Sequence, residues 1–151
     1  MKSFIILLLT ICCFNVFSQS KEYEAKKKAK ISAPSPFEAI ISGDKMDEIV
    51  YQDEYVVAFV PIRKQAPVHL LIVPKKRVYS LNEIQPSDEA MLAHLLLAAK
   101  KLAKDNGIDQ TGYRVSMNTN EDAGQSVFHL HLHLLGGIPL GPIVDQTYKE
   151  K

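Results

Sequence analysis

Histidine alternates with leucine in the segment Gln125-Ser126-Val127-Phe128-His129-Leu130-His131-Leu132-His133-Leu134-Leu135. A period of two is typical of a β-strand, because successive side chains of a strand point to opposite faces. The pattern predicts a strand over 127–135, with its leucines in a core and His129, His131 and His133 together on the other face. Imidazoles are poor core fillers and uncommon on strand surfaces, so three in register indicate a chemical use.

Two uses fit such a row of imidazoles. Histidines at alternate strand positions can converge on a tetrahedral Zn²⁺ ion. Alternatively, one imidazole can act as a nucleophile while its neighbours and the adjacent backbone orient it and bind the anion that it attacks. The flanks favour the second use, since Gly124-Gln125-Ser126 offers close backbone approach, an amide and a hydroxyl, and Gly136-Gly137 ends the strand.

The segment from Gly124 to Gly137 resembles the histidine triad (HIT) nucleotide-binding proteins, whose signature is His-φ-His-φ-His-φ-φ with φ apolar, and in particular their Hint-like purine nucleoside phosphoramidase branch. The likeness covers about residues 36–137 and also includes Pro36 to Ile41, Gln65 to Lys76, Tyr113-Arg114 and Asn118. It implies a HIT-like α+β fold, with a five-stranded antiparallel sheet and two helices, and a homodimer in which two sheets join edge to edge.

The resemblance also implies an activity without a cofactor: a nucleoside 5′-monophosphoryl group passes from a nitrogen or sulfur leaving group to water through a nucleotidyl-histidine intermediate. The substrate expected is a small molecule of the purine nucleotide type. By matching positions, His131 is the nucleophile and the backbone carbonyl of His129 holds its other ring nitrogen. Ser126 passes a proton to the leaving amine, and His69 completes the imidazole network.

The same matching assigns the binding groups. The phosphate is expected to lie against Gly124, Gln125, His133 and Asn118. The apolar walls of a purine pocket are assigned to Phe37, Ile40, Phe59 and Ile62, although large apolar residues can equally be ordinary core. Val60-Pro61 departs from the family pattern, because a carboxylate that takes both ribose hydroxyls usually stands at the second position. The chain also lacks the tryptophan typical of this branch, so base and ribose specificity stay open.

Two rival functions remain beside the phosphoramidase. The chain could bind nucleotides without turning them over, or the three histidines could serve a hydrolytic zinc ion. No metal is expected, because both cysteines, Cys12 and Cys13, lie in the leader described next.

The first residues resemble a secretory signal peptide, with Lys2 followed by an apolar run from Phe4 to Phe17. Small residues allow a cut after Ser18 or Ser20, so residues 1–18 are expected to be a leader and the protein to be exported to the periplasm or secreted. Residues 19–34 are highly charged and predict a flexible, solvated tail. Its lysines could hold the chain weakly to anionic lipid, but a soluble tether is the favoured interpretation.

The remainder predicts one domain over 35–137, followed by an irregular tail over 138–151. The 18 basic and 17 acidic residues nearly balance, which argues against a nucleic-acid partner. We expect helices over 36–43 and from 86 to 105, the second capped by Ser87, and strands over 48–52, 55–60, 68–73, 112–117 and 127–135. His94, within the second helix, is interpreted as a packing or surface residue.

Overall fold

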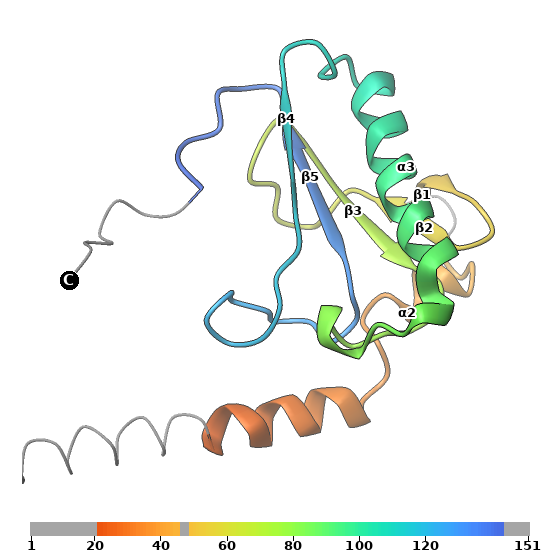
Figure 1. The fold of residues 1–151 in the computed structure, drawn as a ribbon, viewed down its shortest axis with the longest axis vertical. Helices are drawn as coiled ribbons and strands as arrows, with labels where there is room; N and C mark the ends of the chain where they lie inside the picture. Colours follow the sequence, from red (N-terminus) through yellow and green to blue (C-terminus); the bar gives the residue numbers. More distant parts are fainter. Residues whose placement is uncertain (1–20, 46–48, 144–151) are drawn as a thin grey trace, which may run out of the picture.

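The structure is a computed structural model that describes residues 21–45 and 49–143. Its centre is a five-stranded sheet in which every neighbouring pair is antiparallel (Figure 1). The spatial order of the strands is β1 (Ile49–Gln52), β2 (Val56–Phe59), β3 (Val68–Pro74), β5 (Leu132–Gly136) and β4 (Tyr113–Ser116). The predicted α+β fold with a five-stranded antiparallel sheet is confirmed.

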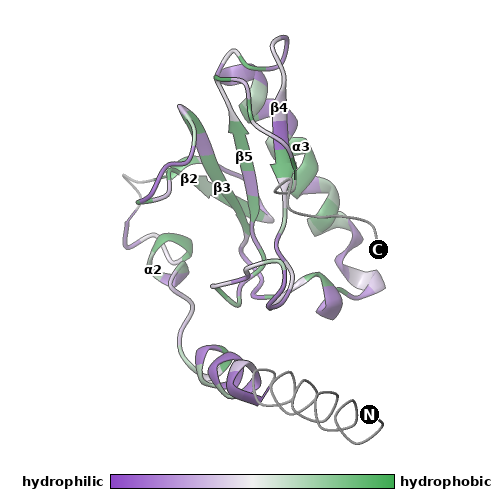
Figure 2. Cartoon of the chain, turned by 90° about the vertical axis from the view of Figure 1, so that its left-hand side faces the viewer, coloured by the Kyte–Doolittle hydropathy of each residue, from purple (hydrophilic) through white to green (hydrophobic). Residues whose placement is uncertain are grey.

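Each face of the sheet has its own apolar cluster, and the inner strands β3 and β5 are largely green, that is hydrophobic, in Figure 2. The long helix α3 (Glu89–Asp105) covers one face, where Leu130, Leu132 and Leu134 are buried. The short helix α2 (Glu38–Ile41) lies over the other face, and Phe37 is buried there. The leucines of the histidine-leucine segment therefore face a core, as the period of two predicted.

The strand that carries the histidines is shorter than predicted. β5 begins at Leu132 and pairs with β3 through Ile72, whereas residues 127–129 form a bend. The chain leaves the ladder here, because Leu130 N–H donates to the carbonyl of Val78, beyond the end of β3, at 2.7 Å. Of the three triad histidines, only His133 lies within the strand.

The start of α3 also differs from the prediction. Two 3₁₀ turns, η2 (Leu81–Glu83) and η3 (Pro86–Asp88), precede it. The carboxylate of Asp88, rather than the hydroxyl of Ser87, accepts a hydrogen bond from the backbone N–H of Gln85 at 3.0 Å. Gln85 is the N-cap residue of η3, so Asp88 forms part of a capping box around this 3₁₀ turn, just before α3 begins.

His94 on α3 packs as expected, with its ring centroid 4.5 Å from that of Tyr55 and its Nδ1 2.9 Å from the carboxylate of Asp53.

The charged segment at the N-terminus is not a flexible tail where the structure describes it. Residues 21–32 form a helix, which we call the charged helix, lying beside the end of the sheet that carries the histidines. Glu22 and Lys26 pair at i,i+4 with a distance of 2.6 Å, which supports the helix locally. Its lysines also bind groups far along the chain, as shown below, and these contacts fix a segment whose composition alone predicts disorder.

The leader over 1–18 and the last part of the tail, 144–151, lie outside the described residues. The described part of the tail, 138–143, has no helix or strand. None of the helices in the described ranges has the length and apolar character needed to span a bilayer.

Candidate active site

The α2 face of the sheet brings three imidazoles together. His69 on β3 shares this face with Leu71, and Leu71 pairs in register with His133 on β5. The ring centroids of His69 and His133 are 5.3 Å apart, and those of His131 and His133 are 5.0 Å apart. The sequence predicts these residues in one site, and the fold brings them into one row.

The ring of His131 is fixed by its own backbone neighbourhood. Its Nδ1 lies 2.8 Å from the carbonyl oxygen of His129. A carbonyl can only accept, so Nδ1 carries the proton and donates it. The other nitrogen, Nε2, is therefore left with a lone pair, which is the form that a nucleophile needs.

A second chain of hydrogen bonds sets the tautomers of the two neighbouring rings. The backbone N–H of Gln65 donates to Nδ1 of His69 at 3.1 Å. Since that nitrogen accepts, Nε2 of His69 carries the proton and donates to Nδ1 of His133 at 3.0 Å. Nε2 of His133 must then carry a proton, so His133 presents a donor next to the lone pair of His131.

His129 is a supporting residue rather than an exposed member of the row. It is 1% exposed, its Nε2 donates to the carbonyl of Pro74 at 2.8 Å, and its Nδ1 accepts from the hydroxyl of Ser35 at 2.7 Å. Neither ring nitrogen is free to bind a metal ion. Within residues 21–45 and 49–143, no group of three or more His, Cys, Asp or Glu is arranged to hold one.

Burial keeps the row uncharged. It lowers the pKa of His129 to about 4, and the charge of Arg77 acts in the same direction. It also lowers the pKa of His133 to about 4, and repulsion between protons on His133 and on the adjacent His131 or His69 adds to this effect. Burial also lowers the pKa of His131 and His69 below their ordinary values. At neutral pH the imidazoles are therefore neutral, and their hydrogen bonds run in the directions derived above.

The loop before the triad differs from its predicted role in one respect. The side chain of Gln125 is buried, and its Oε1 accepts from the N–H of Asn120 at 2.9 Å. Its Nε2 donates to the carbonyls of Tyr79 and Val127 at 2.7 and 3.1 Å. Gln125 thus braces the loop with every polar atom of its side chain, so its assignment as a phosphate ligand does not fit this conformation.

The other predicted loop residues remain available. Gly124 has a φ of +70°, which favours glycine, and no atom of the described residues lies within 4 Å of where a Cβ would stand, so a ligand can approach the backbone. Ser126 is exposed, and its carbonyl oxygen accepts from Nζ of Lys30 at 2.9 Å. Asn118 is half-buried, and its side chain makes no hydrogen bond to any residue that the structure describes.

Three of the four predicted pocket walls gather beside the triad. Phe37, Ile40 and Phe59 are all buried in the α2-side cluster. The ring centroid of Phe37 lies 5.5 Å from those of Phe59 and His131. Ile62 is fully exposed at 104% and does not join them, because it lies in the loop between β2 and β3. The first three residues act here as core that supports the imidazoles.

Sequence reasoning missed Ser35 and the backbone of Gln65. Both act through single hydrogen bonds to a histidine, and a serine or a main-chain N–H leaves no periodic pattern to find. The sequence offered one clue for each: Ser35 stands directly before the Pro36 to Ile41 block that carried part of the resemblance, and Gln65 opens the block that ends at Lys76.

A five-stranded antiparallel sheet whose α2 face carries hydrogen-bonded imidazoles, preceded by a glycine-containing loop, defines a histidine triad domain. The HIT domain family matches the chain over residues 42–140. The purine nucleoside phosphoramidase of Escherichia coli K12 is 44% identical over 108 residues, which cover 72% of this chain and 91% of that protein.

Solved structures agree with this assignment. A HIT family hydrolase from Clostridium thermocellum has a TM-score of 0.68 at 44% identity, covering 72% of this chain and 94% of its own. One from Legionella pneumophila Philadelphia 1 has a TM-score of 0.66 at 44% identity, with coverage of 70% and 94%. The chain belongs to the HIT family, and the Hint-like branch and HIT-like fold predicted from the sequence are confirmed.

Proposed function

We propose that this HIT-family hydrolase cleaves nucleoside 5′-phosphoramidates, or related conjugates of nucleoside monophosphates, through a nucleotidyl-histidine intermediate. The observation that carries the proposal is the hydrogen bond from His131 Nδ1 to the carbonyl of His129, which leaves Nε2 as a free base beside a ring N–H of His133. The 44% identity to a purine nucleoside phosphoramidase supports the nitrogen-linked substrate class.

In the first half-reaction, the lone pair of His131 Nε2 forms a bond to phosphorus while the bond from phosphorus to the leaving nitrogen breaks. The leaving nitrogen takes a proton from the hydroxyl of Ser126, which regains one from solvent because that residue is exposed. The N–H of His133 donates to a non-bridging oxygen. These are the positioned donors on which phosphoryl transfer mainly depends.

In the second half-reaction, water attacks phosphorus, the bond from phosphorus to His131 Nε2 breaks, and the proton of water returns to solvent. The products are the free amine and the nucleoside 5′-monophosphate, and His131 regains its lone pair. During both halves Nδ1 keeps its proton on the carbonyl of His129, so that carbonyl stabilises the positive ring of the intermediate.

The test is incubation with a fluorogenic adenosine 5′-phosphoramidate, with and without a chelator, of wild type and His131→Gly. We expect release of the amine by wild type, insensitivity to the chelator, and a loss of at least about a thousandfold in the variant, since the covalent path disappears with its nucleophile. Acid-quenched wild type should carry a nucleotide adduct by intact mass. Binding of the nucleotide without amine release would favour the binding-only rival, and loss of activity with the chelator would favour the zinc hydrolase.

A further inference from the structure

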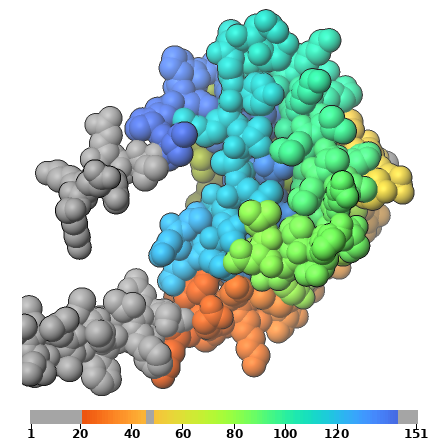
Figure 3. Space-filling model, in the orientation of Figure 1, coloured from red at the N-terminus to blue at the C-terminus, as the bar shows by residue number. Residues whose placement is uncertain are grey.

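The charged helix (21–32) lies outside the residues that match the HIT family, yet its contacts converge on the loop that leads into the triad. Figure 3 shows the helix, in orange, packed against the blue loop before β5. The loop, residues 120–128, holds Ser126 and the brace formed by Gln125. A helix that contacts this loop can therefore affect the position of Ser126, whose hydroxyl protonates the leaving group in the proposed reaction.

Two lysines bind the loop directly. Nζ of Lys30 donates to the carbonyl of Ser126 at 2.9 Å, and Nζ of Lys27 donates to Oδ1 of Asn120 at 3.0 Å. Asn120 has a φ of +64°, a conformation that few residues adopt and that asparagine tolerates. The lysines thus hold the loop at the residue where its backbone turns and at the residue that carries the reactive hydroxyl.

The other contacts fasten the helix itself. Nη1 and Nη2 of Arg77 donate to the carbonyls of Ala33 and Lys30 at 2.8 and 3.2 Å, and its Nε donates to the carbonyl of Phe128 at 3.4 Å. Carbonyls at the end of a helix lack partners within it, and a cation there is favourable. Arg77 therefore joins the end of the charged helix to the last residue of the loop.

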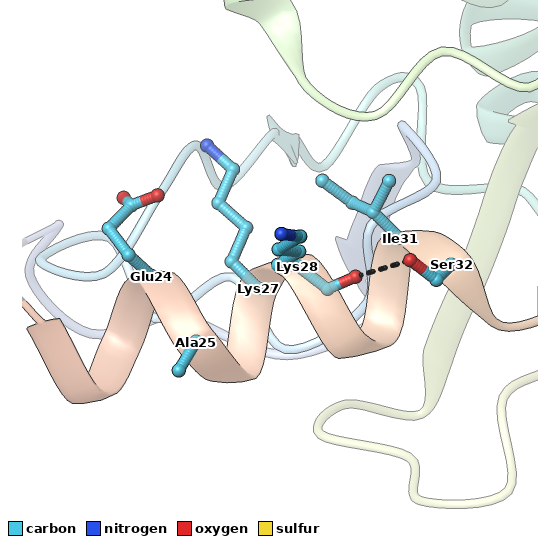
Figure 4. A pocket seen from close by; sticks show the side chains of 6 residues that line it. All are labelled: Glu24, Ala25, Lys27, Lys28, Ile31 and Ser32. Carbon is cyan, nitrogen blue, oxygen red and sulfur yellow. Dashed lines mark hydrogen bonds between the residues drawn. The ribbon is translucent and has the colours of Figure 1, made fainter.

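Apolar packing adds to these bonds. The ring of Tyr23 meets the ring of Phe128 edge-on at 6.3 Å, and Nζ of Lys27 lies 5.8 Å above the same ring. Figure 4 shows that Lys27 and Ile31 leave the helix on the same side, whereas Ala25 points away from it. One side of the helix therefore packs against the domain.

We propose that the charged helix positions the loop 120–128, and that Lys30 places the hydroxyl of Ser126 for proton transfer to the leaving amine. This inference rests on the proposed function. It makes Lys30 a specificity-determining residue that matters for basic leaving groups, which need a proton, and matters little for leaving groups that depart as stable anions.

The experiment compares Lys30→Met, Lys30→Arg and the control Lys28→Met in the otherwise intact protein. Lys28 lies on the same helix, is exposed and loses the same charge. Release of the leaving group is followed in a single turnover with two substrates, the fluorogenic adenosine phosphoramidate and adenosine 5′-(4-nitrophenyl phosphate). Hydrogen exchange of the backbone amides of 120–128 is measured in parallel.

We expect Lys30→Met to slow amine release about tenfold, as a small misplacement of a reacting group does, and to change nitrophenolate release less than about twofold. Lys30→Arg should recover most of the amine rate, and exchange in the loop should rise in Lys30→Met alone. Equal behaviour of Lys30→Met and Lys28→Met, or equal slowing with both substrates, would overturn the inference. A wild type that releases neither leaving group would instead refute the proposed function, and unchanged loop exchange in Lys30→Met would then refute the positioning role separately.

Discussion

Lowering the pH from 7 to 5 is expected to destabilise the fold through His129, whose ring is buried between Ser35 and Pro74. Its pKa is about 4 in the folded protein and about 6.5 in an unfolded chain. Between these values the unfolded chain binds the proton and the folded protein does not. The stability from the neutral ring is therefore complete above about pH 6.5 and is lost as the pH falls toward 4.

Proton linkage gives the size of the effect. For one group with these two pKa values, the free energy of unfolding falls by about 2 kcal/mol between pH 7 and pH 5. The geometry supports a large shift, because a proton on Nδ1 would meet the hydroxyl of Ser35, which already accepts from the N–H of Phe37 at 3.2 Å. If His129 were protonated, the hydroxyl of Ser35 could no longer donate to Nδ1 and would have to accept from both Nδ1 and the N–H of Phe37.

The assay is urea unfolding of wild type and His129→Gln at pH 7, 6 and 5, followed by circular dichroism because the chain has no tryptophan. Carboxylates titrate in both proteins, so the difference between the two pH slopes isolates His129. NMR titration of the wild-type imidazoles provides a measurement that does not depend on the variant. Parallel slopes together with protonation of His129 near pH 6.5 in the folded protein would refute the reasoning.

Three further outcomes are expected. Pro61→Asp should raise the preference for ribo- over deoxyribonucleotide substrates by about threefold to thirtyfold in kcat/KM. A hydrogen bond to a charged group contributes about 1.5 to 3 kcal/mol, and the cost of desolvating the new carboxylate reduces this gain. A wild type that already prefers ribose a hundredfold would show that another residue binds the ribose hydroxyls. We propose a homodimer, because β4 ends the sheet with an unpaired edge; light scattering at micromolar concentration should give twice the chain mass, and a monomer would contradict it. We also propose that the protein is exported. N-terminal mass spectrometry of the protein from its native host should find Gln19 or Lys21 as the first residue, in a fraction outside the cytoplasm. An intact Met1 in a cytoplasmic fraction would disprove export.

Local patterns predicted the parts of the fold that local physics determines. The strands expected over 48–52, 55–60, 68–73 and 112–117 match β1 to β4 to within one residue at each end, and the helix expected from 86 to 105 contains α3. The period of two correctly separated leucines from histidines, but it could not show where pairing with β3 stops. That boundary depends on the hydrogen bond from Leu130 to Val78, which joins residues from different parts of the chain.

The sequence predicted those residues of the candidate site that belong to the histidine-leucine pattern. His131 and His133 are members of a pattern, whereas Ser35 acts on a ring 94 residues away through one hydroxyl. The charged helix shows a different failure. Its sequence has almost no large apolar groups, so composition predicted a flexible tail, and the polar bonds from Lys27 and Lys30 that order it reach 93 and 96 residues along the chain.

The hydrogen bond from Gln65 N–H to His69 makes a main-chain atom responsible for which nitrogen His133 offers to a substrate. Any amino acid except proline supplies that N–H, so the side chain at position 65 is free to vary without reversing the two rings. The path of the backbone after β2 therefore determines which ring nitrogens of His69 and His133 carry protons. A shift of this loop that removed the N–H from His69 would let both rings reverse donor and acceptor, with every histidine still in place.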